Sequence, residues 1–217
     1  MAKGSHVQGG LIPFAAKTIR EKFRAGSRLV VAVGGPPASG KTAFSEALVK
    51  SLNDNPEKPI QSCLVSIDGF RLDTSQFESL GILPHWGAKR SFDFDGIRNL
   101  LEGIRVSRSP VFYPVYDRTK ERAVPGAGVV SPETDIVIVK GNYLLLDDQP
   151  WIELETLFDL EFFLDTPMPR CLIPWFDGAI HSVEWKDALW DRYVMAAPRP
   201  RTPSEQQYSD RKLRTRS

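Results

Sequence analysis

A glycine-rich octapeptide constrains the fold of this chain more than any other feature. Residues 35–42 read Gly-Pro-Pro-Ala-Ser-Gly-Lys-Thr and match the phosphate-loop pattern G-x-x-x-x-G-K-[ST]. The β-branched, apolar run at 29–33 predicts a buried strand before the loop, and apolar residues at helical spacing in 43–52 predict a helix after it. A helix that begins at such a loop directs backbone N–H groups and the positive end of its dipole at an anion. Nucleotide-phosphate binding is therefore predicted for Gly35, Pro36, Pro37, Ala38, Ser39, Gly40, Lys41 and Thr42.

The last two residues of this loop have separate predicted roles. Lys41 is expected to reach the β- and γ-phosphates, and the Thr42 hydroxyl is expected to ligate Mg²⁺. The motif alone fits a kinase, a GTPase or a motor protein. Because the sequence has no Asn-Lys-x-Asp motif for reading guanine, a GTPase is disfavoured.

The rest of the sequence predicts a single α/β domain over residues 1–217. Further apolar runs at 63–67, 136–139 and 158–164 predict buried strands, and helical patterns separate them. Strands that alternate with helices after a phosphate loop predict a P-loop NTPase fold, with a mostly parallel sheet covered by helices on both faces. Helices are expected over 11–23, after a capping box of Ser75 and Glu78, and from Asp93 or Asp95 onward.

The less regular segments also carry expectations. Residues 111–116 resemble a short edge strand, and the Gly- and Pro-rich segment 118–128 is expected to be a loop. A helical lid is expected at about 170–201, followed by a basic C-terminal helix over 202–217. Residues 1–10 are expected to be disordered or partly a cloning remnant.

Charge and cysteine content limit the partners that we expect. The chain carries 28 basic and 27 acidic residues, and this balance gives no overall field that favours nucleic acid or a membrane. No apolar run approaches the roughly 20 residues that span a bilayer. Cys63 and Cys171 lie far apart without metal-ligand spacing, which fits reduced thiols in the cytoplasm. A homodimer is left open.

Asp68 is the strongest candidate for a catalytic acid or base. It follows the predicted strand at 63–67, and the carboxyl ends of neighbouring parallel strands open toward the phosphates. A carboxylate there is placed to orient an acceptor hydroxyl and to take its proton late in phosphoryl transfer. The alternative is that Asp-Gly is only a turn signal.

A set of motifs after the loop carries a resemblance to a known family. The set comprises the segments 66–73, 87–88, 91–93, 116–118 and 137–147. In this order, they resemble the small-molecule kinase group that contains uridine kinase, phosphoribulokinase and bacterial-type pantothenate kinase. The likeness runs from about residue 29 to about residue 187, and it is greatest to the branch named after fructose-transport-system kinases.

The resemblance implies an ATP-dependent kinase that uses Mg²⁺ and phosphorylates a hydroxyl of a sugar, nucleoside or pantothenate-like metabolite. Asp68 matches the catalytic base and a metal-side residue. Arg170 falls in the lid, where a cation would face the transferring phosphoryl group. Substrate contacts are expected from residues near the acceptor pocket, which are Asp68, Arg71, Tyr116, Arg118, Asn142 and Tyr143. For Arg118 and Arg170 a solvated surface role remains the alternative, and for Tyr116 packing.

Lys140 departs from the family pattern. It stands where the family usually has Glu, at the end of the strand before Gly141-Asn142-Tyr143. The reversed charge favours two interpretations, namely impaired Mg²⁺ binding or turnover, and direct contact of Lys140 with phosphate. The rival functional prediction is therefore a catalytically impaired nucleotide-binding regulatory protein.

Overall fold

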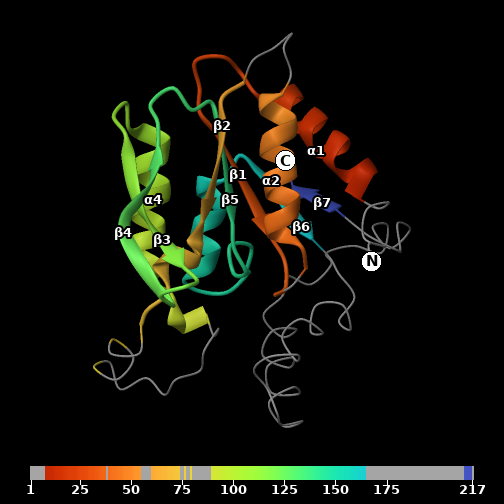
Figure 1. Ribbon diagram of the computed structural model, residues 1–217. Helices are drawn as coiled ribbons and strands as arrows, with labels where there is room; N and C mark the ends of the chain where they lie inside the picture. Colours follow the sequence, from red (N-terminus) through yellow and green to blue (C-terminus); the bar gives the residue numbers. More distant parts are fainter. Residues whose placement is uncertain are drawn as a thin grey trace, which may run out of the picture.

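A five-stranded sheet organises the molecule (Figure 1). The computed structural model describes residues 8–37, 39–54, 60–73, 76, 79, 89–164 and 213–216. The strand order is β2-β5-β1-β6-β7. Neighbours among the first four strands are parallel, and β7 is antiparallel to β6. The strands are β1 (Leu29–Gly34), β2 (Ser62–Ser66), β5 (Ile136–Lys140), β6 (Leu160–Leu164) and β7 (Leu213–Arg216). The prediction of a mostly parallel α/β sheet is confirmed.

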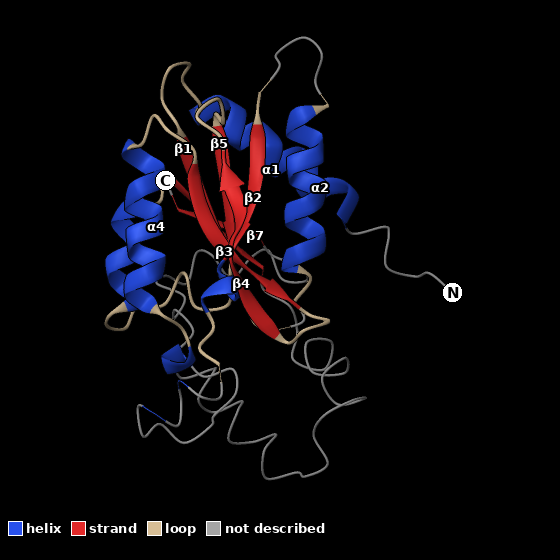
Figure 2. Ribbon diagram, turned by 60° about the vertical axis from the view of Figure 1, so that its left-hand side comes forward, coloured by secondary structure: helices blue, strands red, loops and turns tan. Residues whose placement is uncertain are grey.

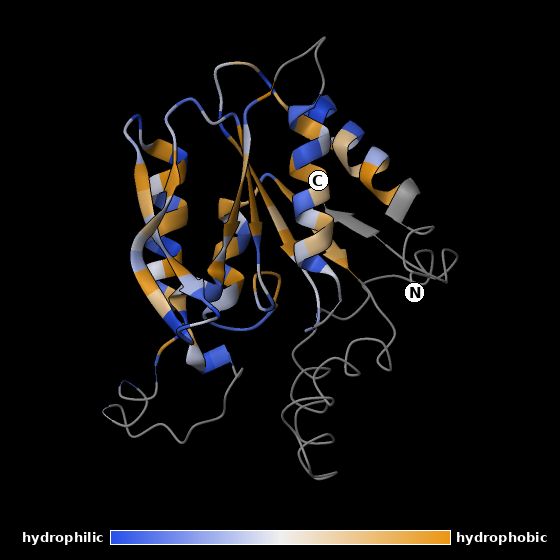
Figure 3. Cartoon of the chain, viewed as in Figure 1, coloured by the Kyte–Doolittle hydropathy of each residue, from blue (hydrophilic) through white to orange (hydrophobic). Residues whose placement is uncertain are grey.

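The two central strands are buried along their whole length. Every residue of β1 and of β5 is buried, which suits their β-branched composition. Because side chains alternate along a strand, Val31 and Ile138 pack into one hydrophobic cluster, while Val30 and Val139 pack into another. Figure 3 shows these strands as mainly hydrophobic and the helices as mixed. The sheet therefore separates two cores.

Two helices cover the first face of the sheet (Figure 2). They are α1 (Gln8–Lys22) and α2 (Lys41–Asn53). Phe44 and Leu48 of α2 are buried in the same cluster as Ile19 of α1. The Arg20 guanidinium donates hydrogen bonds to carbonyl oxygens near the end of α2 and so ties the two helices together.

The second face is covered by more varied elements. Helix α4 (Phe94–Val106) begins at Asp93, whose carboxylate accepts a hydrogen bond from the Gly96 amide. Around it lie the 3-10 helices η1 (Ile67–Phe70), η2 (Lys89–Ser91) and η3 (Trp151–Leu157). A separate hairpin of β3 (Val111–Asp117) and β4 (Arg122–Val130) completes this face.

The hairpin corrects one prediction. Most of the segment expected to be a loop, 118–128, belongs to β4, and the residues at 111–116 pair with β4 and not with the edge of the main sheet. Pro and Gly are tolerated here because a two-stranded ribbon has free edges. A register shift lies between Tyr113 and Val115, and a side chain at Gly128 would collide with the Tyr113 ring. Glycine there serves packing and not chain flexibility.

The chain end gives a second correction. Residues 213–216, expected to close a basic helix, form strand β7 beside β6. The open edge of a sheet presents unpaired backbone groups, and pairing with them outweighs helical propensity. Residues 202–212 lie outside the described part of the chain, as do residues 1–7, the expected lid at 170–201 and most of the helix expected near Ser75. None of the described helices is long and apolar enough to cross a membrane.

Candidate active site

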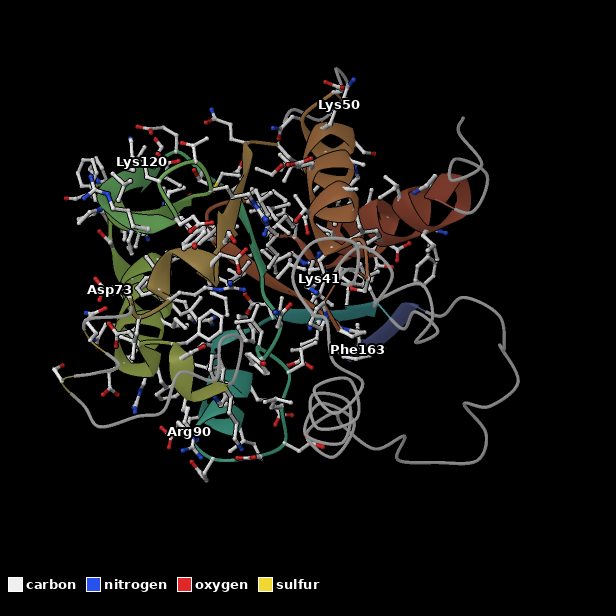
Figure 4. The ribbon with its side chains drawn as sticks, turned by 60° about the horizontal axis from the view of Figure 1, so that its bottom comes forward. Lys41, Lys50, Asp73, Arg90, Lys120 and Phe163 are labelled. Atoms are coloured by element: carbon white, nitrogen blue, oxygen red, sulfur yellow. The ribbon has the colours of Figure 1, made fainter. Side chains whose placement is uncertain are left out.

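Three chemically important positions meet at the carboxyl edge of the sheet. Lys140, the last residue of β5, is in register with Val33 of β1 on one side and with Ser66 of β2 on the other. The glycine-rich loop follows β1, and Asp68 follows β2. Parallel strands release their loops at the same edge, and for that reason the loop, Lys140 and Asp68 lie together. Figure 4 looks onto this end of the molecule and labels Lys41, the first residue of α2.

Glycines fix the shape of the loop. A side chain at Gly35 would lie 2.8 Å from the Leu164 carbonyl oxygen and 2.9 Å from Ser39 Oγ. Gly40 adopts a left-handed conformation with φ of 89° and leads directly into α2. Within the described residues, α2 has no side-chain cap and no acidic group in its first turn. Its N-terminus thus keeps the arrangement that favours an anion.

Lys41 lies inside the loop. Its side chain is buried, and its ammonium donates hydrogen bonds to the carbonyl oxygens of Gly35 (2.9 Å) and Pro36 (2.6 Å). Ser39 Oγ lies 3.4 Å from Lys41 Nζ. Thr42 is exposed in the first turn of α2. Ala38 lies outside the described residues, and phosphate binding by the octapeptide stays a prediction.

Asp68 lies in η1 and forms the centre of a charged cluster. Its Oδ2 accepts hydrogen bonds from Lys140 Nζ at 3.2 Å and from Ser66 Oγ at 3.1 Å. Its Oδ1 lies 3.6 Å from Nη2 of Arg71. Burial by itself raises the pKa of this carboxyl, but the charges of Lys140 and Arg71 and the hydrogen bonds outweigh burial and lower the pKa below its usual value. Asp68 is therefore a carboxylate at neutral pH.

Two glycines hold the Asp68 turn in place. A side chain at Gly69 would collide with the carbonyl oxygen of Pro114 in β3. A side chain at Gly141, just after β5, would collide with Ile67. The Gly69 contact is with backbone and requires glycine, whereas the Gly141 contact is with the Ile67 side chain, so η1 packs tightly between the hairpin and the end of β5. The turn that carries Asp68 therefore also positions the hairpin.

Arg71 connects Asp68 to the hairpin. Its guanidinium carbon lies 5.4 Å from the centre of the Phe92 ring and 5.8 Å from the centre of the Tyr116 ring. These are cation–π distances, and they fix the orientation of the guanidinium. Among the described residues, the buried Arg71 Nε has no hydrogen-bond partner. The structure thus brings the predicted site residues Asp68, Arg71 and Tyr116 together.

The other predicted substrate residues are placed differently. Arg118 is exposed in the turn between β3 and β4, and Asn142 is half-buried just after β5. Tyr143 is buried, with its ring 5.7 Å from Phe92 and 5.6 Å from Trp151, and burial raises its pKa to about 12. Arg170 lies outside the described residues. Substrate roles for these residues remain predictions.

Sequence reasoning missed two features of the site. The sequence presents Phe92 only as part of the motif at 91–93, yet its ring contacts the Arg71 guanidinium. The ion pair of Lys140 with Asp68 was also not foreseen, although both residues follow or end neighbouring strands. The carboxyl ends of neighbouring parallel strands lie at the same edge of a sheet, and this rule could have predicted that Lys140 and Asp68 lie close together.

The described donors limit how Mg²⁺ could bind. Among the residues that the structure describes, no group of three or more His, Cys, Asp or Glu is placed to hold a metal ion. The exposed Thr42 hydroxyl fits a Mg²⁺ that arrives on the nucleotide, because this ion is commonly held by phosphates, waters and few protein oxygens. Asp68, the other predicted ligand, is paired with Lys140 and Arg71.

Comparisons with known proteins identify the family of this chain. Residues 30–174 match the phosphoribulokinase / uridine kinase family. The uncharacterized protein YggC of Escherichia coli (strain K12) is 34% identical over 142 residues, which are 64% of this chain and 57% of that protein. A pantothenate kinase of Streptomyces avermitilis is 28% identical over 159 residues, which are 70% of this chain and 48% of the kinase. The chain spans about half the length of these curated relatives.

A solved structure extends the agreement to the fold. It is a candidate fructose transport system kinase from Silicibacter sp. TM1040, with a TM-score of 0.71 and 31% identity. The alignment covers 84% of this chain and 88% of that one. The match over most of the sequence, the phosphate loop and the parallel sheet all lead to one conclusion. This chain belongs to the phosphoribulokinase / uridine kinase family of P-loop kinases.

Proposed function

We propose that this protein transfers the γ-phosphoryl group of Mg-ATP to a hydroxyl group of a small metabolite. The family and the named relatives support phosphotransfer to a small molecule. The observation that carries the proposal is the register of Val33, Lys140 and Ser66, which puts the phosphate loop and Asp68 at one edge of the sheet. A sugar, a nucleoside or a pantothenate-like compound is the expected acceptor.

The nucleotide half of the reaction uses the loop and α2. Backbone amides from Gly35 to Thr42 would hold the triphosphate, and the Lys41 ammonium would move from the loop carbonyls to the β- and γ-phosphates. Mg²⁺ bound with the nucleotide would neutralise charge on the phosphate oxygens, and Thr42 is the ligand that fits it. These groups position the nucleotide and stabilise charge.

The acceptor half uses Asp68 and its neighbours. The acceptor oxygen attacks the γ-phosphorus, the bond to the β-phosphate oxygen breaks, and ADP leaves. The acceptor's proton passes to the Asp68 carboxylate late in the step. The lowered pKa of Asp68 keeps it ionised but makes it a weak base, and a late transfer requires no stronger one. Arg71 and Tyr116 would line the acceptor side. The predicted lid with Arg170 would exclude water, which would otherwise hydrolyse ATP.

An assay of acceptor-stimulated ADP release tests the proposal. Purified protein with Mg-ATP is offered sugars, nucleosides and pantothenate in turn, after a thermal-shift screen with the same compounds and an ATP analogue. The proposal expects at least one acceptor to raise ADP release well above the rate without acceptor. ATP binding without stimulation by any acceptor would count against it.

The ion pair at Asp68 favours one second candidate. Because Lys140 holds the Asp68 carboxylate, a catalytically impaired nucleotide-binding regulator is the alternative function. Such a protein would bind ATP tightly and release no ADP in response to an acceptor. The same assay therefore separates the two candidates.

A further inference from the structure

Lys140 points toward the face of the sheet that carries the phosphate loop. Side chains alternate along β5, and Ile136 and Ile138 pack into the cluster that contains Phe44 and Leu48 of α2. Val137 and Val139 pack into the opposite cluster. Lys140 continues the series of Ile136 and Ile138. Its side chain therefore leaves the sheet on the side covered by α2, whose N-terminus is the loop.

The backbone places Lys140 next to the strand that delivers the loop. Lys140 is opposite Val33 in the β1–β5 pairing, and the Gly141 amide donates to the Val33 carbonyl oxygen at 3.1 Å. Neighbouring strands lie about 4.8 Å apart. Gly34 and Gly35 follow Val33 directly. The base of the Lys140 side chain is thus one strand away from the start of the phosphate loop.

Among the described residues, the charges around Asp68 do not balance. The Lys140 side chain is only 11% exposed, and both its ammonium and the Arg71 guanidinium pair with the single carboxylate of Asp68. An ammonium has three donors, and one of them is directed at Asp68 Oδ2. Burial of an excess positive charge is costly unless an anion balances it. A phosphate held by the neighbouring loop is an anion of the right kind.

We propose that Lys140 is a second phosphate-binding lysine, whose ammonium binds the γ-phosphate of the bound nucleotide while it also holds Asp68 in place. The inference rests on the nucleotide binding of the proposed function and adds a role for a residue whose charge is opposite to that usual in the family. Lys41 and Lys140 then contact the transferring group from the loop and from the adjacent strand. Asp68 stays available to the acceptor hydroxyl.

The preference for a triphosphate over a diphosphate tests this role without any acceptor. Calorimetric titrations would measure the binding of the imido analogue of ATP, and of ADP, to the wild type and to Lys140→Met, both with Mg²⁺. Loss of a charge-assisted contact predicts analogue binding weaker by about 10- to 100-fold and ADP binding changed by less than about twofold. Lys120→Met is the matched control, because Lys120 is exposed on the hairpin and pairs with Asp117. It is expected to alter neither affinity.

A second pair of variants distinguishes direct contact of Lys140 with the γ-phosphate from simple masking of the negative charge of Asp68. If Lys140 only masks the charge of Asp68, its removal has no effect once Asp68 is neutral. The comparison of Asp68→Asn with the double variant Asp68→Asn and Lys140→Met therefore isolates the contact with the γ-phosphate. The double variant removes both charges of the Lys140–Asp68 ion pair, whereas Lys140→Met alone leaves the Asp68 carboxylate without this partner. The double variant therefore remains informative if Lys140→Met alone does not fold.

The outcomes are distinct. A selective loss of analogue binding in both backgrounds supports the inference. An unchanged ratio of analogue to ADP affinity, or a loss confined to the background with an intact Asp68, overturns it. A wild-type protein that binds neither nucleotide overturns the proposed function and this inference together. A wild type that binds both, with Lys140→Met indistinguishable from it, overturns only the inference.

Discussion

The two faces of the sheet differ in how they are built. On one face, α1 and α2 pack on alternate residues of the parallel strands, and the phosphate loop forms where β1 passes into α2. On the other, α4, η1, η3 and the two-stranded hairpin contribute to one hydrophobic cluster, and η1 carries Asp68. We propose that the first face binds the triphosphate of ATP and that the second face binds the acceptor.

The largest effect is expected at the boundary between the two faces. Asp68→Asn removes the proton acceptor while its amide oxygen still accepts a hydrogen bond from Lys140. Turnover with a verified acceptor should fall by about 10²- to 10⁴-fold, and ATP affinity should stay near the wild-type value. Steady-state kinetics and nucleotide titration would measure both. Asp95→Asn, which alters an exposed carboxylate of α4, should leave turnover unchanged. Unaltered turnover in Asp68→Asn would refute the role of Asp68.

A change on the nucleotide face should act on ATP itself. Lys41→Ala removes the ammonium inside the loop, and it should weaken ATP binding and lower turnover by about 10²- to 10³-fold. Lys50→Ala is the matched control, because Lys50 is exposed at the other end of α2 (Figure 4). Equal affinity and rate for Lys41→Ala and wild type would contradict the assignment of the loop.

A change on the acceptor face should leave ATP untouched. Arg71→Met removes the guanidinium held between Phe92 and Tyr116. The KM of the acceptor should rise by about 10-fold or more, as for loss of one hydrogen bond to a charged group, with the KM of ATP unchanged. Arg108→Met, at an exposed position after α4, provides the control. An equal rise in both KM values would show that the two faces do not work separately.

The smallest effects are expected in stability, and a pair of glycines shows them. Gly69→Ala would drive a methyl group into the Pro114 carbonyl and should cost about 1–3 kcal/mol in the free energy of unfolding. Gly10→Ala, on the open side of α1, should instead stabilise by up to about 1 kcal/mol. Denaturant titration would compare them. A neutral Gly69→Ala would show that the turn and the hairpin are not in close contact.

The same contrast explains what the sequence predicted. The strands at 29–33 and 136–139 were predictable because a fully buried strand is a continuous β-branched run, and Asp93 was one of two candidate caps. β4 was not predictable, because Pro125 and its neighbouring glycines indicate a loop unless the partner strand is known. β7 depends on the open edge of β6, which no local pattern records.

The candidate site divides in the same way. Local motifs identified Lys41 and Asp68, since a phosphate loop and a carboxylate at a strand end are features of short segments. The pairing of Asp68 with Lys140, and the stacking of Arg71 on Phe92, join segments far apart in the chain. Such contacts follow from the order of strands in the sheet, which single-sequence patterns do not give.

Transfer of label from γ-labelled ATP to an acceptor tests the central claim most directly. The protein would be incubated with the acceptor that most raises ADP release, and the products would be separated and identified by mass. The account predicts a labelled phosphate ester of the acceptor with the wild type, and at least a hundredfold less of it with Asp68→Asn. Label that stays in ATP, or appears only as inorganic phosphate, while ATP still binds, would contradict it.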